Sequence, residues 1–420
     1  MIINQGRFHG FARETGGVVT DRPASAHTSD LPRLFYVGDV AVEATTGGSA
    51  LLHRLLGEYP PNRLAVAVGD MCPVGIGPSL PGVKQIRFHV GWARLSRTRF
   101  HRVYSGWLDL TAAGRSRRLI DEARAFGAQA ILTVTHASSF ITAADLARRL
   151  SLPLHLILHD DWFSLRNLPS TLNRWAERTF GSIYRQASTR QCVCRYMAEA
   201  YEKRFGVPGT ELYPTCAPDA PRFDCPPMRL KDPAAPIVVG YAGSLILDAY
   251  SHAIARVAET LERVGGRVVV YSNLNLEAAR NVGLDRPNVQ LRPIVPSNVL
   301  IKALREECTA LFTPMTFDAS MRVHMEMSFP SKMTDYSLVG VPMLIWGPPY
   351  CSAVRWAKEN APLAEVVDDP DPSSLVAGVL KLGDPEFRFK LAQATMAAGR
   401  KFFDHSAARD RFFDALRSCR

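Results

Sequence analysis

The chain has 420 residues, 47% hydrophobic and 21% charged, which are the proportions of an ordinary globular protein with room for two domains. It contains no apolar run of membrane-spanning length and no secretory signal at its start, so we expect a cytoplasmic protein. The formal net charge of +10 points to anionic partners such as phosphate-bearing substrates or an acidic membrane surface, whereas no recognition motif for nucleic acid accompanies it.

The eight cysteines do not suggest a metal site or a disulfide framework. Cys192 and Cys194 are one residue apart, and no second close pair or histidine partner completes a zinc pattern. We therefore expect free thiols and no bound metal.

The first half of the chain predicts a parallel sheet. Residues 1–33 are polar and irregular and form an expected N-terminal arm. Four continuous apolar runs follow, separated by helical patterns: LFYVGDVAV (34–42), LAVAVGD (64–70), AILTVTH (130–136) and LHLILHDDW (154–162). Continuous apolar strands between helices indicate a parallel sheet covered on both faces, so residues 34–215 are predicted to form a Rossmann-like domain.

The second half repeats the same rhythm. Residues 216–236 are rich in proline and are the candidate linker. Strand and helix patterns alternate again over 237–395, and a helix over 396–420 is a candidate to pack back on the first domain. The predicted fold class is α/β, with two doubly wound Rossmann-like domains facing each other across a cleft. Such sheets bind ligands at the carboxyl ends of their strands, so the cleft is the expected active site.

A segment of the second half has the features of a phosphate-binding helix start. From residue 329 the chain reads FPSKMTDYSLVGVPMLIWGPP. A helix N-terminus attracts a diphosphate, Ser331 and Lys332 add a hydroxyl donor and a cation, and Asp335 could accept hydrogen bonds from ribose hydroxyls. Gly340 can end the helix. The alternative is an ordinary surface pair between Lys332 and Asp335, three residues apart.

The order of motifs in this half resembles the donor domain of GT-B-fold glycosyltransferases, in particular the large family 4 group. The motifs are GYAGSL, VYSN, RPIVPSN, LFTPMTFD and FPSKMTDYSLVGVPML, with weaker echoes in TTGGSA and LHDDW of the first half. The resemblance implies a nucleotide-sugar donor such as a UDP- or GDP-sugar, transfer to an acceptor hydroxyl, and no metal cofactor. The donor-binding residues that it implies are Gly243, Ser244, Ser272, Ile294, Val295, Ser331, Lys332 and Asp335.

The resemblance also implies a role in bacterial polysaccharide, glycolipid or other glycoconjugate synthesis, and a retaining mechanism. One departure affects the mechanism. Many family members carry two glutamates seven residues apart, but here the second position is Asp335 and the first is Met327, with Glu326 one place away. Two other interpretations therefore stay open: a non-catalytic scaffold or carbohydrate-binding protein of the same fold, and a sugar-nucleotide epimerase.

The first half supplies the catalytic candidates. His159 ends a predicted strand and precedes Asp160 and Asp161. A histidine at this place in related enzymes faces the donor sugar, so His159 and Asp160 are the implied catalytic residues. The loop Thr46, Gly47 and Gly48 is expected close to the sugar or acceptor. A helix-capping aspartate beside a packed histidine is the alternative, and metal binding by the two aspartates is a weaker one.

Residues 91–110, GWARLSRTRFHRVYSGWLDL, combine arginines with aromatic residues. The apolar residues at one-face helical spacing are Phe100, Val103, Tyr104, Trp107 and Leu108. Such a helix could anchor the enzyme peripherally on the inner, anionic face of the plasma membrane, where the acceptor would be a lipid-linked sugar. It could equally pack its apolar face on the first domain and leave its arginines in solvent.

Overall fold

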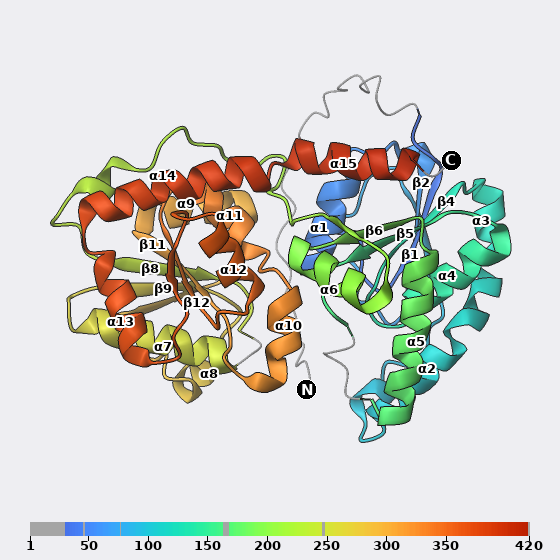
Figure 1. Ribbon diagram of the computed structural model, residues 1–420, viewed down its shortest axis with the longest axis horizontal. Coiled ribbons are helices and arrows are strands. Elements are labelled where there is room, and N and C mark those ends of the chain that lie inside the picture. The colour runs from blue at the N-terminus through green and yellow to red at the C-terminus, as the bar shows by residue number, and fades with distance from the viewer. Residues whose placement is uncertain (1–29, 45–46, 76, 163–167, 246–247, 419–420) are drawn as a thin grey trace.

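The computed structural model describes residues 30–44, 47–75, 77–162, 168–245 and 248–418. Two lobes lie side by side, each built on one parallel sheet with helices packed around it (Figure 1). The predicted fold class, two Rossmann-like α/β domains, is therefore confirmed. Most of the expected N-terminal arm, and Thr46 of the predicted glycine loop, lie outside the described residues.

The first lobe contains a seven-stranded sheet in the order β3-β2-β1-β4-β5-β6-β7, in which every neighbouring pair is parallel. The four predicted apolar runs form its central strands β2, β1, β4 and β5, which are buried along their whole length. The strand bounds are β1 Leu34–Gly38, β2 Leu64–Gly69, β3 Lys84–Phe88, β4 Ala130–Val134, β5 Leu154–Leu158, β6 Thr189–Cys192 and β7 Thr210–Glu211.

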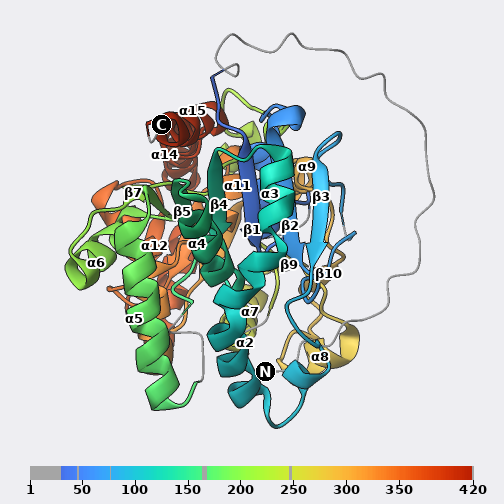
Figure 2. The ribbon, with the colours of Figure 1, turned by 90° about the vertical axis from the view of Figure 1, so that its right-hand side faces the viewer.

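The helices of this lobe lie on two sides of it, one facing the second lobe and one facing away. Helices α1 and α6 lie toward the second lobe, whereas α2, α3, α4 and α5 lie on the outer side (Figures 1 and 2). Their bounds are α1 Gly47–Leu56, α2 His101–Arg115, α3 Ile120–Phe126, α4 Ser139–Leu150, α5 Ser170–Gln186 and α6 Arg195–Phe205. Helix α6 packs against α10 of the second lobe.

The second lobe contains a six-stranded parallel sheet in the order β10-β9-β8-β11-β12-β13. Its strands are β8 Val238–Ala242, β9 Arg267–Tyr271, β10 Val289–Arg292, β11 Ala310–Pro314, β12 Met343–Trp346 and β13 Glu365–Val367. Its helices are α7 Asp248–Glu262, α8 Leu276–Asn281, α9 Ser297–Glu307, α10 Arg322–Met327, α11 Lys332–Val339, α12 Ser352–Glu359, α13 Pro372–Lys381 and α14 Pro385–Phe402.

Both sheets reverse their strand order at one point, between β1 and β4 in the first lobe and between β8 and β11 in the second. At such a point the loops that follow the two strands diverge to opposite faces of the sheet, and the crevice left between them is where doubly wound proteins bind ligands. The fold therefore provides one ligand-binding crevice in each lobe.

The proline-rich segment 216–236 runs along the second lobe and is held there by arginines. Arg388, whose side chain is fully buried, donates from Nε to the carbonyl of Leu230 at 2.6 Å. Arg400 donates to the carbonyl of Phe223 at 3.0 Å, and Arg305 donates to that of Cys225 at 2.8 Å. The segment is consequently an ordered part of the second lobe's surface.

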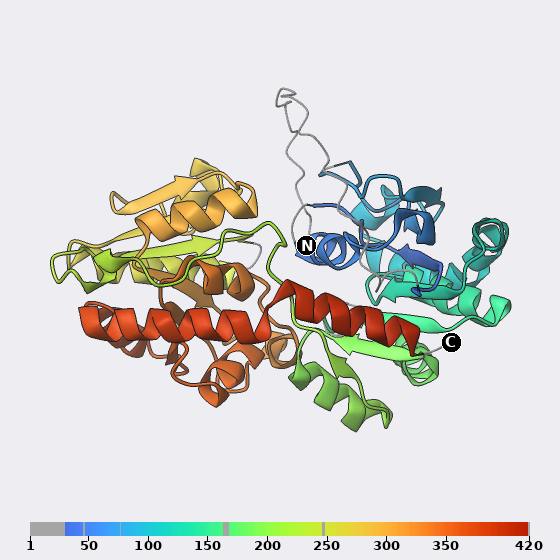
Figure 3. The same cartoon turned by 90° about the horizontal axis from the view of Figure 1, so that it is seen from above.

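The chain ends by crossing back to the first lobe. Residue 396 lies inside α14, and the helix breaks later, where the side chain of Asp404 accepts from the backbone N–H of Ala407 to cap α15 (His405–Arg417). Figure 3 shows α14 over one lobe and α15 over the other. Phe412 and Phe413 of α15 are buried in the core of the first lobe, and the Phe413 ring packs edge-on against that of Tyr59 at 5.5 Å.

Within the described ranges, every helix is too short or too polar to cross a bilayer.

We predict that Phe412→Ala lowers the unfolding midpoint of the first lobe. Phe412 is fully buried, and removing a buried aromatic ring costs about 3–5 kcal/mol. Arg411→Ala, on the exposed side of the same helix, is the matched control and should leave the midpoint within a degree or so. Thermal unfolding followed by circular dichroism compares the two. Equal midpoints would mean that α15 does not depend on this packing.

Candidate active site

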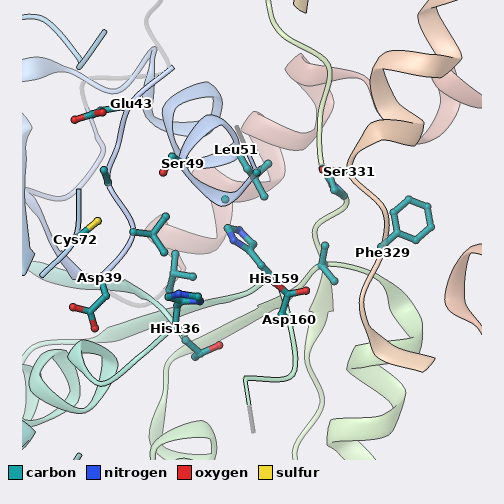
Figure 4. A pocket seen from close by; sticks show the side chains of 18 of the residues that line it. Asp39, Glu43, Ser49, Leu51, Cys72, His136, His159, Asp160, Phe329 and Ser331 are labelled. Atoms are coloured by element: carbon teal, nitrogen blue, oxygen red, sulfur yellow. The ribbon is translucent and has the colours of Figure 1, made fainter. Parts of the chain in front are cut away.

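A cavity of about 470 Å³ opens between the lobes. All of its described lining comes from the first lobe except Phe329 and Ser331, which lead into α11 (Figure 4). The first-lobe walls are the loops after β1, β4 and β5 and the first turns of α1, so the cavity lies at the carboxyl edge of that sheet. His159, Asp160, Gly47 and Gly48 of the sequence prediction all line it, together with Ser331.

The imidazole of His159 lies against the start of α1. A Cβ atom at position 48 would come within 3.0 Å of its Nδ1, so any larger residue there would press on the ring. Its Nε2 is buried and has no hydrogen-bond partner among the described residues. Burial lowers the pKa of His159 to about 4, although the carboxylate of Asp160 acts in the opposite direction. His159 is therefore neutral at physiological pH.

A second histidine, His136, enters the cavity from the end of β4. Its ring centroid is 4.1 Å from that of Trp162. The next residue, Ala137, has a left-handed φ of 50°, and Asp39 then accepts from the backbone N–H groups of Ser138 and Ser139 at 3.0 and 2.8 Å. This tight, capped turn fixes the direction in which β4 ends. Burial lowers the pKa of His136, against the effect of the Asp39 and Asp160 carboxylates.

Asp160 is the electrostatic centre of the cleft. Its carboxylate partly opposes the lowering of the pKa values of His136 and His159 by burial, and it also interacts with His324 and Tyr250 of the other lobe. Asp161, in contrast, is buried, accepts from the hydroxyl of Tyr201 at 2.7 Å and lies 3.8 Å from Arg204. The two neighbouring carboxylates therefore have different surroundings, one in the cavity and one in the core.

In the described part of the chain, no three His, Cys, Asp or Glu side chains come together in a group that could hold a metal ion. The weaker alternative for Asp160 and Asp161, a shared metal site, has no third ligand there.

The predicted phosphate-binding helix start is present as α11, which begins at Lys332 with Ser331 as its N-cap residue. The ammonium of Lys332 lies 4.0 Å from the ring centroid of Tyr241 and 5.8 Å from that of Tyr250. Burial lowers the pKa of Lys332 to about 7, and no carboxylate of the described residues pairs with it. An ammonium held by ring faces alone is a site that a bound anion would complete.

Gly243, at the end of β8, lies beside this lysine. Its φ of 140° belongs to the region that favours glycine, and a Cβ atom there would be 3.6 Å from Lys332 Nζ. The structure thus brings together Gly243, Lys332 and the N-terminus of α11, three of the predicted phosphate-binding features.

Asp335 does not pair with Lys332. Its Oδ2 accepts from the hydroxyl of Ser297 at 2.9 Å, and its Oδ1 lies 3.6 Å from Nη2 of Arg54 on α1. The alternative of an i,i+3 surface pair is wrong, because Asp335 faces the other lobe. Arg54 also donates to the carbonyl of Thr215, where the chain leaves the first lobe, so this ion pair joins the lobes beside their connection.

The other predicted donor residues follow the ends of β8, β9 and β10. Ser244 is exposed, and its carbonyl accepts from the hydroxyl of Tyr241 at 3.0 Å. Ser272 is buried and accepts from the N–H of Leu274 at 3.2 Å, which forms a turn. Ile294 is exposed and Val295 is half-buried on the loop before α9. They share one edge of the sheet with Lys332, but the structure shows no contact between these side chains and the lysine.

The structure also shows the position at which many family members carry the first of their two glutamates. Met327 is buried, and Glu326 pairs with Arg322 at 2.7 Å outside the cavity. On the same helix the Nδ1 of His324 lies 2.9 Å from the hydroxyl of Ser328, and burial lowers the pKa of this histidine. Helix α10 therefore carries an imidazole that interacts electrostatically with Asp160, whereas its carboxylate, that of Glu326, is paired with Arg322.

Sequence reasoning missed His136, His324, Asp39, Tyr241 and Arg54. His136 had a usable signal, because it ends a predicted strand just as His159 does, and neighbouring parallel strands bring their ends together. The other four follow from contacts between segments far apart in the sequence.

Comparisons with known proteins agree with this architecture. Residues 75–214, a third of the chain and all within the first lobe, match the family model described as Glycosyltransferase Family 4. No curated protein gives a significant match.

Several solved structures share the fold. HepE from Anabaena, in complex with UDP and glucose, superposes with a TM-score of 0.65 at 13% identity over 92% of this chain and 100% of its own. Sucrose-phosphate synthase from Thermosynechococcus elongatus gives 0.63 at 11% identity over 92% and 98%. The α,α-trehalose-6-phosphate synthase from Burkholderia multivorans gives 0.60 at 13% identity over 92% and 97%.

At these identities the structural likeness concerns the fold. It confirms the predicted GT-B architecture over 92% of the chain, within which residues 75–214 carry the sequence pattern of glycosyltransferase family 4.

Proposed function

We propose that this protein is a glycosyltransferase that moves a sugar from a nucleoside-diphosphate sugar to an acceptor hydroxyl. The observation that carries the proposal is the half-buried ammonium of Lys332, which pairs with no carboxylate of the described residues and lies beside Gly243 and the start of α11. A donor diphosphate at this point would be bound by the lysine and by the N-terminus of α11. Its sugar would then extend past Ser331 into the cavity that His159 and Asp160 line.

In this arrangement the acceptor oxygen attacks the anomeric carbon from the face that the diphosphate leaves, as the bond to the diphosphate breaks, and the acceptor's proton passes to an oxygen of the departing diphosphate. Lys332 and the α11 N-terminus stabilise the negative charge of the departing nucleoside diphosphate, which is the main electrostatic task of the reaction. Asp160 accepts a hydrogen bond from the acceptor hydroxyl, and neutral His159 orients the sugar. Because Lys332 supplies positive charge at the leaving group, we propose transfer without a metal ion.

We extend the proposal to retention of the anomeric configuration and to a role in bacterial polysaccharide or glycolipid synthesis, on the likeness to family 4. The likeness to HepE in complex with UDP-glucose makes UDP the first nucleotide to test. A second candidate, nucleotide-sugar binding without transfer, is favoured by the buried Met327 where a glutamate is expected. Nucleotide binding with no sugar transfer to any acceptor would support it.

Calorimetry with UDP, GDP and ADP tests the phosphate site by measuring how many protons the protein takes up when the nucleotide binds. Free Lys332 has a pKa of about 7 and is mostly neutral at pH 8. A bound diphosphate favours the ammonium and raises this pKa, so binding should take up as much as about one proton at pH 8 and fewer at pH 6, where the free lysine is already mostly charged. Affinity should accordingly fall as the pH rises above 7.

Lys332→Met should abolish the proton uptake and weaken nucleotide binding by about 2–3 kcal/mol, or roughly thirty- to 150-fold. Lys302→Met, an exposed lysine of the same lobe, is the control and should change neither quantity. Unchanged affinity and proton uptake in the Lys332 variant would contradict the assignment.

We predict that His159→Ala lowers kcat by at least tenfold and changes donor affinity much less, because the imidazole lies in the cavity rather than at the phosphate site. Since burial holds the pKa of His159 at about 4, the wild-type rate should show no loss from its protonation between pH 8 and 6. Only below about pH 5 should that protonation reduce the rate. Steady-state kinetics decides between this role and simple packing, which full activity of the variant would indicate.

We also propose that the enzyme binds peripherally to an anionic membrane. The structure corrects the face that was expected to be apolar. Tyr104 is buried, with its hydroxyl accepting from the N–H of Trp92, and Leu108 is half-buried. The other three residues of the expected face are exposed, Phe100 at 60%, Val103 at 62% and Trp107 at 44%, and Leu110, 54% exposed, completes the stripe that faces solvent.

The surroundings of this stripe are those of an interfacial surface. Trp92 is also exposed and stacks on Trp107 with their ring centroids 6.4 Å apart. The same segment carries four exposed arginines, Arg94, Arg97, Arg99 and Arg102, and the guanidinium of Arg99 lies 4.9 Å from the ring centroid of Phe100. Exposed aromatic and aliphatic side chains together with cations are typical of helices that lie in the headgroup region of anionic bilayers.

The membrane proposal predicts that changing the whole stripe to Ser abolishes flotation of the protein with phosphatidylglycerol vesicles; the changed residues are Phe100, Val103, Trp107 and Leu110. Changing the arginines to Gln should weaken membrane binding by about 1 kcal/mol for each of Arg97, Arg99 and Arg102. The control changes four equally exposed apolar residues elsewhere, Met228, Val264, Leu276 and Val299, to Ser. If the control and the stripe variant float alike, or the wild type does not float, the proposal fails.

A further inference from the structure

The cavity has an uneven distribution of charge. Its described lining includes three carboxylates, those of Asp39, Glu43 and Asp160, and no lysine or arginine (Figure 4). Its two histidines, His136 and His159, have pKa values lowered by burial and add no positive charge near neutral pH. The cation of the proposed donor site, Lys332, is not part of this lining.

Two of the carboxylates are fixed parts of the wall. Asp39 accepts from the backbone N–H groups of Ser138 and Ser139 and from the Ser139 hydroxyl, the last at 2.7 Å. Glu43 is buried and accepts from the N–H of Gly75 at 2.7 Å. Because these hydrogen bonds hold them in place, the two carboxylates contribute fixed negative charge to the cavity wall.

The third carboxylate is available to a ligand. Asp160 lies in the cavity beside His159, and the structure shows no hydrogen bond or ion pair to it within the described residues. The buried Nε2 of His159, which also has no partner there, is a second polar group in the same wall. A carboxylate and a neutral imidazole together suit sugar hydroxyl groups, which both donate and accept hydrogen bonds.

We propose that this cavity selects an uncharged, hydroxyl-bearing acceptor and rejects acceptors that carry phosphate or carboxylate close to the reacting hydroxyl. The inference rests on the proposed function, since it treats the cavity as the acceptor side of a transferase. An acid group entering here would meet three carboxylates without a cation to pair with, whereas a neutral sugar would donate hydrogen bonds to Asp160. The same carboxylates would stabilise positive charge developing at the anomeric carbon.

The experiment measures binding of matched sugar pairs to UDP-saturated protein by ligand-observed NMR. The probes are glucose, mannose and galactose, each compared with its 6-phosphate, and glucose compared with glucuronic acid. Each neutral sugar should bind at least about tenfold more tightly than its acidic counterpart at low ionic strength, which is the size expected from like charges several ångströms apart.

Asp160→Asn should reduce that ratio severalfold, whereas Asp121→Asn, an exposed carboxylate on α3 of the same lobe, should leave it unchanged. Equal or tighter binding of the acidic sugars, a ratio that Asp160→Asn does not alter, or binding of no neutral sugar would each overturn the inference. Failure of the proposed function is distinguishable, because UDP and the other nucleoside diphosphates would then not bind at Lys332 at all.

Discussion

A lysine ammonium that pairs with no carboxylate of the described residues is the constraint around which the proposed site is organised. Lys332 is half-buried, and the faces of two tyrosine rings and the backbone near Gly243 lie beside it. Proteins rarely withdraw a cation from water without a counter-ion, because its desolvation is not compensated, and such a group loses its proton more readily. The site therefore suits an anion that arrives from outside, and the partial positive charge at the start of α11 suits the same anion.

The two sheets place this cation opposite a cavity wall that carries negative charge. The start of α11 in the second lobe lies beside a cavity at the carboxyl edge of the first sheet. The carboxylates of that cavity are on the loops that follow β1 and β5. Positive charge where a diphosphate leaves and negative charge where the sugar is attacked is the arrangement that a glycosyl transfer requires. The pair between Arg54 and Asp335, and α15 packed on the first lobe, hold the halves of this site together.

The sequence was sufficient for the elements that local physics determines. Continuous apolar runs gave the central strands, and the proline and glycine that bound FPSKMTDYSLVG gave the limits of α11 within two residues. It was not sufficient where two distant segments meet. Asp335 has its charged partner on α1, and nothing in either segment identifies the other. Helix α2 carries apolar residues at helical spacing on two faces, and only packing against the first lobe decides that Tyr104 points inward and Trp107 outward.

A structure of the protein with UDP bound would test the central claim most directly. The account predicts a diphosphate oxygen within hydrogen-bonding distance of Lys332 Nζ and of the first backbone N–H groups of α11, with the lysine drawn away from the ring of Tyr241. A nucleotide bound elsewhere, with Lys332 still against that ring and no anion beside it, would contradict the account.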